Sequence, residues 1–238
     1  MNSLNGRKVV IIGATSGIGL ATARLAAEAG AEVWGVSRSP EKVAAAAASL
    51  PQVRFSELDT HDNEGLIRLC SQVGQIDHLV AAATGADRTL KPFLEQTDEQ
   101  FREAFNKFWG YCNVIRAGAP YLTETGSVTL VSGIPARKCN VGMSSLSCVG
   151  SAVEGLTRAL ALELAPRRVN VVAPGIIDTG MFERLGDNKP AALAQMGKNV
   201  PLGRVGQSDE VAGAILHTMT NTYMTGATLD VDGGSLLP

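Results

Sequence analysis

The chain has 238 residues, four cysteines and a formal net charge of −2. Its length fits one α/β domain with a sizeable core, so we expect a single domain over residues 1–238. The small net charge argues against nucleic acid or an anionic membrane surface as a partner. No apolar run approaches the roughly 20 residues that span a bilayer.

The cysteines and histidines bear on compartment and metal binding. No two cysteines form a C-x-x-C pair, and the first eight residues contain no apolar segment of a secretory signal. Both observations favour a cytoplasmic protein with reduced thiols. We expect no metal site, because the three histidines lie far apart in the sequence and beside no clustered cysteines.

The first predicted strand, residues 9–12, leads into a glycine-rich turn. Four consecutive apolar residues indicate a strand buried on both faces, and an alanine-rich helix at 20–29 follows and ends at Gly30. This order places free backbone N–H groups and the positive end of a helix at one point, which suits a pyrophosphate. An ordinary strand–helix turn is the alternative. The candidate cofactor-binding residues are Gly13, Thr15, Ser16, Gly17, Ile18 and Gly19.

The three glycines of this turn have separate predicted roles. Gly13 makes the tight turn, Gly17 lets the backbone approach the ligand, and Gly19 lets the helix pack close to the sheet.

The second predicted strand, residues 31–36, ends in Ser37 and Arg38. In dinucleotide-binding folds this strand end meets the adenosine ribose, where an acidic residue would accept a hydrogen bond from a 2′-hydroxyl. An arginine suits a 2′-phosphate instead. Ser37 and Arg38 therefore predict NADP rather than NAD, with a solvated arginine in a turn as the alternative.

Strands and helices continue to alternate along the chain. Strands are predicted at 53–58, 75–83, 127–132, 168–174 and 229–231. Asp62 is expected to cap one helix, Thr97 to open another with a capping box, and Ser208 to be the N-cap of the last. In the helix that begins after Thr97, four residues at helical spacing predict one packed face: Phe101, Phe105, Phe108 and Cys112.

The Gly-x-x-x-Gly-x-Gly spacing of residues 13–19 differs from the Gly-x-Gly-x-x-Gly of most dinucleotide folds, and at this point the chain resembles the short-chain dehydrogenase/reductase family. Residues 155–166 and 168–175 look like that family almost residue for residue. The resemblance implies a Rossmann-type, doubly wound α/β domain with a mostly parallel sheet. The ligand would lie at the carboxyl ends of the strands.

The resemblance also implies a set of cofactor contacts. Asp59, with Thr60 beside it, would bind the adenine amino group, and Ala83 would line the nicotinamide ribose. The Ile177 backbone and Thr179 would contact the carboxamide end of the cofactor, and Pro174 and Gly175 before them are further candidate cofactor-binding residues.

Residues 180–203 correspond to the family's variable lid. Its apolar side chains predict a small-molecule substrate with apolar bulk; they are Met181, Phe182, Leu185, Leu193 and Met196.

The resemblance fails at the catalytic residues. Aligned without gaps, the family's tyrosine falls on Leu146, its lysine on Gly150, its serine on Gly133 and its asparagine on Lys107. Leucine and glycine side chains neither donate, accept nor titrate, so they cannot manage a proton.

Lys107 is the best replacement that the sequence offers. Gly150 is expected to leave open the space of the usual ammonium, which a lysine from the facing helix could fill, although a surface or inter-helix salt bridge is equally consistent with Lys107. Ser132 is a second candidate, although strand alternation would aim it away from the side that Gly133 faces.

The sequence thus predicts an NADP(H)-dependent oxidoreductase of short-chain type for a carbonyl/alcohol pair, with Lys107, water or the substrate supplying the proton. The alternatives are an NADP(H)-binding protein without redox turnover and a non-redox isomerase or cyclase. By resemblance we also expect a homodimer or homotetramer, through helices that carry Phe101, Phe105, Trp109, Leu156 and Leu160.

Overall fold

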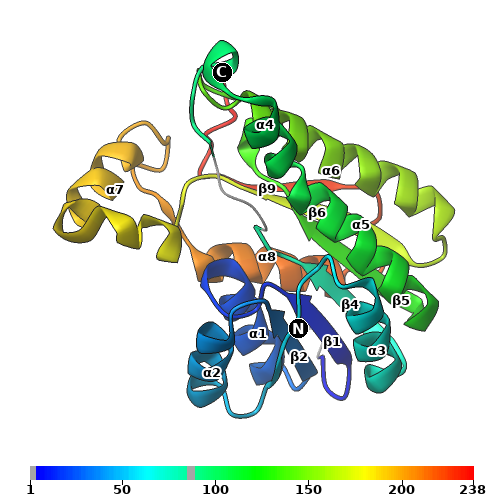
Figure 1. Ribbon diagram of the computed structural model, residues 1–238. Coiled ribbons are helices and arrows are strands. Elements are labelled where there is room, and N and C mark those ends of the chain that lie inside the picture. Colours follow the sequence, from blue (N-terminus) through cyan, green and yellow to red (C-terminus); the bar gives the residue numbers. More distant parts are fainter. Residues whose placement is uncertain (1–3, 85–88) are drawn as a thin grey trace.

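The computed structural model describes residues 4–84 and 89–238. Within them, seven parallel strands form one sheet in the order β3-β2-β1-β4-β5-β6-β9 (Figure 1). They are β1 (Lys8–Ile12), β2 (Glu32–Ser37), β3 (Arg54–Glu57), β4 (Ile76–Ala81), β5 (Leu122–Val131), β6 (Arg168–Pro174) and β9 (Thr228–Val231). The strand order reverses between β1 and β4, which confirms the predicted doubly wound, Rossmann-type sheet.

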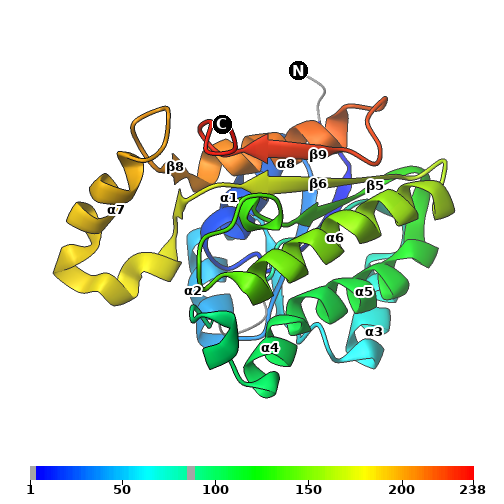
Figure 2. The same cartoon turned by 90° about the horizontal axis from the view of Figure 1, so that it is seen from above.

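Helices cover both faces of the sheet (Figure 2). On one face lie α1 (Gly17–Glu28) and α8 (Ser208–Thr220); the other carries α3 (Asn63–Val73), α5 (Asn106–Gly118) and α6 (Ser144–Glu163). α2 (Pro40–Ser49) packs beside β2 and β3. The smaller elements are α4 (Asp98–Ala104), α7 (Lys189–Gly197), the strand pair β7 (Ile177–Asp178) and β8 (Gly206–Gln207), and the 3-10 helices η1 (Phe93–Glu95), η2 (Ala119–Tyr121), η3 (Ile134–Ala136) and η4 (Gly180–Asn188).

The central strand β1 shows why the sheet is buried on both sides. Val10 and Ile12 belong to the core under α3, α5 and α6, while Val9 and Ile11 belong to the core under α1 and α8. Successive strand side chains point to opposite faces, so a continuous apolar run fits a strand covered by two helical layers.

The predicted helix starts are confirmed with one exception. Asp62 caps α3 and Thr97 opens α4 with a capping box. The N-cap of α8, however, is Gln207 and not Ser208. The Glu210 carboxylate accepts a hydrogen bond from the Gln207 backbone N–H at 2.8 Å, and the Ser208 hydroxyl donates to the Asp178 carbonyl instead.

The predicted aromatic helix is in fact two helices. Phe105 lies at the junction between α4 and α5, so the four residues from Phe101 to Cys112 do not share one uninterrupted face. Phe105 stacks on Phe101 and packs edge-on against Phe108. The three phenylalanine rings therefore contact one another in succession from α4 to α5.

The described residues contain no helix that is both long and apolar enough to cross a bilayer. Trp109 on α5 is 52% exposed, whereas Leu156 and Leu160 of α6 pack partly into the core. The homodimer or homotetramer expected through these helices stays a prediction.

A buried histidine couples stability to pH. His78 on β4 is 8% exposed, and its Nδ1 lies 2.9 Å from the Ser127 hydroxyl. Desolvation lowers the pKa of His78 from 6.5 to about 4, against a smaller opposing effect of Asp77.

We expect His78 to weaken the fold in acid. The pKa of His78 is lower in the folded protein than in the unfolded chain, so protonation favours unfolding. The free energy of unfolding is therefore unaffected by His78 above about pH 6.5 and falls by up to about 3 kcal/mol as the pH decreases towards 4. His78→Asn keeps a donor towards Ser127 but cannot take up the proton. In urea unfolding, its free energy of unfolding should fall less between pH 7.5 and 4.5 than that of the parent. The control His61→Asn, at an exposed site, should follow the parent, and identical curves for all three proteins would contradict the assignment.

Candidate functional site

The glycine turn between β1 and α1 is built by close backbone contacts. Gly13 has φ of +87°, and a Cβ atom there would lie 2.6 Å from the backbone nitrogen of Ala83. A Cβ atom at Gly19 would overlap the carbonyl oxygen of Gly13. Side chains are excluded at both positions, so β1, the start of α1 and the segment after β4 meet at one point. The predicted site residue Ala83 therefore lies beside the turn.

The start of α1 offers backbone N–H groups at this edge of the sheet. Ser16 is the N-cap in an extended conformation, and its side chain makes no capping hydrogen bond to any residue that the structure describes. The first N–H groups of a helix have no acceptor within it, and the helix dipole adds partial positive charge. This end of α1, with Thr15 and Ser16 in front of it, is thus suited to an anion. The Ile18 side chain packs against the core instead, which leaves its backbone for ligand contact.

The turn also touches the start of the predicted lid. A Cβ atom at Gly17 would lie 3.1 Å from the methyl carbon of Thr179. Thr179 follows β7 and caps η4, since its Oγ1 accepts a hydrogen bond from Met181 N at 3.4 Å. The predicted phosphate-binding turn and the predicted lid are therefore direct neighbours.

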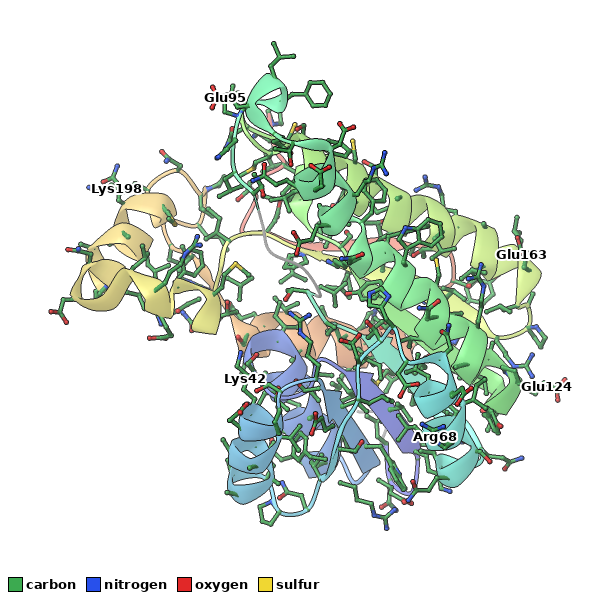
Figure 3. All side chains as sticks on the ribbon, viewed as in Figure 1. Lys42, Arg68, Glu95, Glu124, Glu163 and Lys198 are labelled. Carbon is green, nitrogen blue, oxygen red and sulfur yellow. The ribbon has the colours of Figure 1, made fainter. Side chains whose placement is uncertain are left out.

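The predicted lid, residues 180–203, contains η4 and α7, which extend away from the sheet (Figure 1). Lys198, the residue after α7, lies on the outer side of this segment (Figure 3). Lys189 ties the two helices to β7: its Nζ lies 2.9 Å from the Asp178 carboxylate and 2.6 Å from the Glu183 carboxylate. A cleft of about 520 Å³ lies between α1 and the lid. Its lining includes Gly17, Arg24, Asp178, Thr179, Glu183, Lys189 and Asp209.

The ends of β2 and β3 form the other end of the predicted cofactor site. Arg38 is exposed and directly follows Ser37, the last residue of β2. Parallel pairing places Glu57 of β3 opposite Ser37. Reasoning along the second strand alone missed this carboxylate, because the register between two strands is not visible in either of them.

Asp59 and Thr60 lie in the loop after β3, which begins at Leu58. The Leu58 N–H donates to the Ser37 carbonyl at 3.0 Å, which joins this loop to the end of β2. Asp59 is exposed and its Oδ1 accepts a hydrogen bond from the His61 N–H at 2.9 Å. The loop is thus folded on itself beside Ser37 and Arg38.

The structure brings the two candidate catalytic residues together. Lys107 on α5 is half-buried, and its Nζ lies 3.5 Å from the carbonyl oxygen of Ser132, which follows β5. The same ammonium lies 5.4 Å from the ring centre of Tyr111, a distance at which a cation is attracted to a π face. The Tyr111 hydroxyl donates to the Val131 carbonyl at 3.2 Å. Lys107 is therefore directed at the carboxyl end of β5.

A buried carboxylate that the sequence reasoning missed lies next to Ser132. Glu154 on α6 is 6% exposed and accepts a hydrogen bond from the Ser132 hydroxyl at 3.2 Å. Arg137 lies 3.3 Å from the same carboxylate and also pairs with Asp230 on β9. Leu146, Gly150 and Glu154 follow each other at intervals of four on α6, and this helical spacing was the available signal.

The space beside Gly150 is filled, contrary to the expectation from the sequence. A Cβ atom at Gly150 would lie 2.9 Å from the Cβ of Ala136 in η3. The Ser151 hydroxyl donates to the Ala136 carbonyl at 2.9 Å and holds η3 against α6. An ammonium from Lys107 therefore does not enter a gap at Gly150, because a loop from the end of β5 already occupies it.

The end of β6 completes this edge of the sheet. Pro174 and Ile177 are buried, and the Gly175 N–H donates to the Val231 carbonyl at 3.0 Å. A Cβ atom at Gly133 would lie 3.8 Å from the Pro174 carbonyl oxygen. The predicted residues from β5 and β6 thus adjoin each other, while Ser37 and Arg38 lie at the opposite end of the site.

Comparison with known proteins supplies the family. The family model described as enoyl-(acyl carrier protein) reductase matches residues 13–235. The MalC reductase/Diels-Alderase of Malbranchea aurantiaca is 32% identical, with a TM-score of 0.92 over 100% of this chain and 99% of that one. The NADPH-bound short-chain oxidoreductase of Pseudomonas aeruginosa PAO1, described as containing an atypical catalytic center, is 30% identical, with a TM-score of 0.91 over 98% and 97%.

A further relative, the L-xylulose reductase of Mesocricetus auratus, is 32% identical over 98% of each chain. The chain belongs to the short-chain dehydrogenase/reductase family. Its glycine turn, its parallel sheet and its segment at residues 155–175 are the parts in which the sequence first showed this membership.

Two glycine substitutions on α6 test whether η3 packs against this helix. Glycine to alanine in a helix normally stabilises by about 0.5–1 kcal/mol. Gly155→Ala should show this gain, because an added Cβ would meet only an Arg158 nitrogen at 3.9 Å. Gly150→Ala should instead destabilise by about 1–3 kcal/mol, since Ala136 must move. Urea unfolding measures both, and an equal gain at the two positions would show that η3 does not rest on α6 as described.

Proposed function

We propose that this protein is an NADP(H)-dependent oxidoreductase that interconverts a carbonyl and an alcohol on a small molecule with apolar bulk. The observation that carries the proposal is the meeting of the glycine turn, Ala83 and Thr179 at the carboxyl edge of the sheet, where doubly wound folds bind dinucleotides. Family relatives whose structures are described as NADPH-bound support the cofactor.

The residues fit this cofactor along the whole edge of the sheet. The pyrophosphate would lie at residues 13–19, and the nicotinamide half beside Ala83, Pro174, Gly175, Ile177 and Thr179. The adenosine half would lie beside Ser37, Arg38, Asp59 and Thr60. When bound, the cofactor supplies the hydride, and the chain supplies binding, orientation and the proton.

Cofactor choice is assigned to Arg38. Its guanidinium matches a 2′-phosphate. The carboxylate of Glu57, which lies opposite Ser37 on β3, would repel the same phosphate and so limit the preference for NADPH over NADH. NADPH should bind more tightly than NADH, and Arg38→Asp should reverse the order, because a carboxylate repels the phosphate and accepts from a 2′-hydroxyl. Fluorescence titration with the two cofactors measures both affinities, and equal affinities in the parent would refute the assignment.

The proton chemistry is assigned to Lys107. By family resemblance the usual tyrosine, lysine and serine are replaced by Leu146, Gly150 and Gly133, so the developing alkoxide needs another positive group. Lys107 is held 3.5 Å from the Ser132 carbonyl at the end of β5, beside the edge where the nicotinamide half would lie. Ser132 would hold the Lys107 ammonium through its carbonyl oxygen, because its hydroxyl donates a hydrogen bond to Glu154.

Removal of the ammonium tests this role. Lys107→Met should lower kcat by at least about 100-fold with little change in NADPH affinity, which is the usual loss for an acid–base group. Arg68→Met removes a charge from the exposed surface of α3 and should leave both values unchanged. Carbonyl substrates are followed by NADPH absorbance, and full activity of Lys107→Met would assign the proton to water or to the substrate.

A second candidate function is cofactor binding without redox turnover, or cyclase or isomerase chemistry in the same pocket. Leu146, Gly133 and Gly150 favour it, since none of the three carries a titratable group. One relative, MalC, is described as a reductase/Diels-Alderase, which supports non-redox chemistry as an alternative in this pocket. Tight NADPH binding with no oxidation by a panel of carbonyl substrates would favour this candidate.

A further inference from the structure

Helix α5 connects the two ends of the proposed cofactor site. Near its start, the Lys107 ammonium approaches the Ser132 carbonyl at the end of β5. Two turns later, the Asn113 side-chain amide donates a 3.1 Å hydrogen bond to the carbonyl of Thr60, in the loop after β3. One helix therefore contacts both the predicted catalytic edge and the predicted adenine loop.

The contact between α5 and this loop is close. A Cβ atom at Gly110 would lie 2.5 Å from the Thr60 hydroxyl oxygen, so the loop rests directly on the helix backbone. Gly110 and Asn113 are one turn apart and therefore share a face of α5. Gly110 contacts the side chain of Thr60 and Asn113 binds its carbonyl oxygen, so both residues hold Thr60 against α5.

α5 is itself held firmly on the sheet. The Tyr111 hydroxyl bonds the Val131 carbonyl, and a Cβ atom at Gly118 would lie 2.7 Å from the Leu79 side chain. At its start the loop is joined to β2 by the hydrogen bond from the Leu58 N–H to the Ser37 carbonyl. Beyond Leu58 the other bonds are local: Asp59 accepts from His61, and Asp62 accepts from Gly65 at the start of α3. Asn113 thus connects the part of the loop beyond Leu58 to a helix that is fixed on the sheet.

We propose that Asn113 is a positioning residue for the adenosine half of the cofactor. It acts through Thr60 and keeps the Asp59–Thr60 backbone in place beside Ser37 and Arg38. This inference rests on the proposed NADP(H) function. Without the amide donor, the Thr60 carbonyl loses its partner on α5, and residues 59–60, which lie beyond the Leu58 contact to Ser37, gain freedom to move. Binding would then have to order the loop first.

The test compares Asn113→Leu, which removes the donor at similar volume, with Asn106→Leu at an exposed position of the same helix. The probes are 2′,5′-ADP, which carries only the adenosine half, and NADPH. Calorimetry and fluorescence titration give the two dissociation constants. The emission spectrum of bound NADPH reports the nicotinamide environment independently.

For Asn113→Leu we expect both dissociation constants to rise by about tenfold, the value of one hydrogen bond, with an unchanged emission spectrum of bound NADPH. Asn106→Leu should match the parent. Parent-like affinities in Asn113→Leu would overturn the inference and leave the proposed function intact. An altered emission spectrum would overturn it too, because damage would then reach the nicotinamide end. A parent that binds neither probe would overturn the proposed function and the inference together.

Discussion

The close approach of three backbone segments at the glycine turn is the constraint on which the rest of the molecule depends. Gly13 must accommodate the backbone after β4, and Gly19 must accommodate the carbonyl of Gly13. Side chains at either position would push α1 away from the sheet or β4 away from β1. The same contact leaves the first N–H groups of α1 at the carboxyl edge of the sheet, so the packing requirement and the anion-binding property have one origin.

A second set of contacts organises the opposite side of the site. η3 rests on Gly150, Arg137 joins Glu154 to Asp230, and Ser132 turns its hydroxyl to Glu154. These groups form a compact cluster of one arginine and two carboxylates, in which the buried Glu154 carboxylate is satisfied by Arg137 and the Ser132 hydroxyl. Because the cluster occupies the part of α6 near Gly150, we assign the proposed proton chemistry at this edge to Lys107 on the facing helix α5.

The elements that could be predicted from the sequence are those with local causes. The Thr97 capping box and the Asp62 cap are formed between residues three apart, and both are present. The predicted N-cap of α8 is wrong because the Ser208 hydroxyl bonds Asp178, a residue 30 positions earlier in the chain. The spacing of the aromatic residues predicts one continuous helix, because periodicity alone contains no sign of the break at Phe105.

By itself, the sequence determined the buried parallel strands, the glycine turn and the family, because each of these depends on neighbouring residues or on a fixed spacing. Tertiary structure alone decided that Glu57 faces Ser37, that Glu154 binds Ser132, and that Ala136 fills the space at Gly150. Lys107 lies between these two cases: the family resemblance selected it, and the packing of α5 directed it to Ser132. The physical reason is the same throughout, since strand register and helix–loop packing join residues whose separation along the chain carries no signal of their contact.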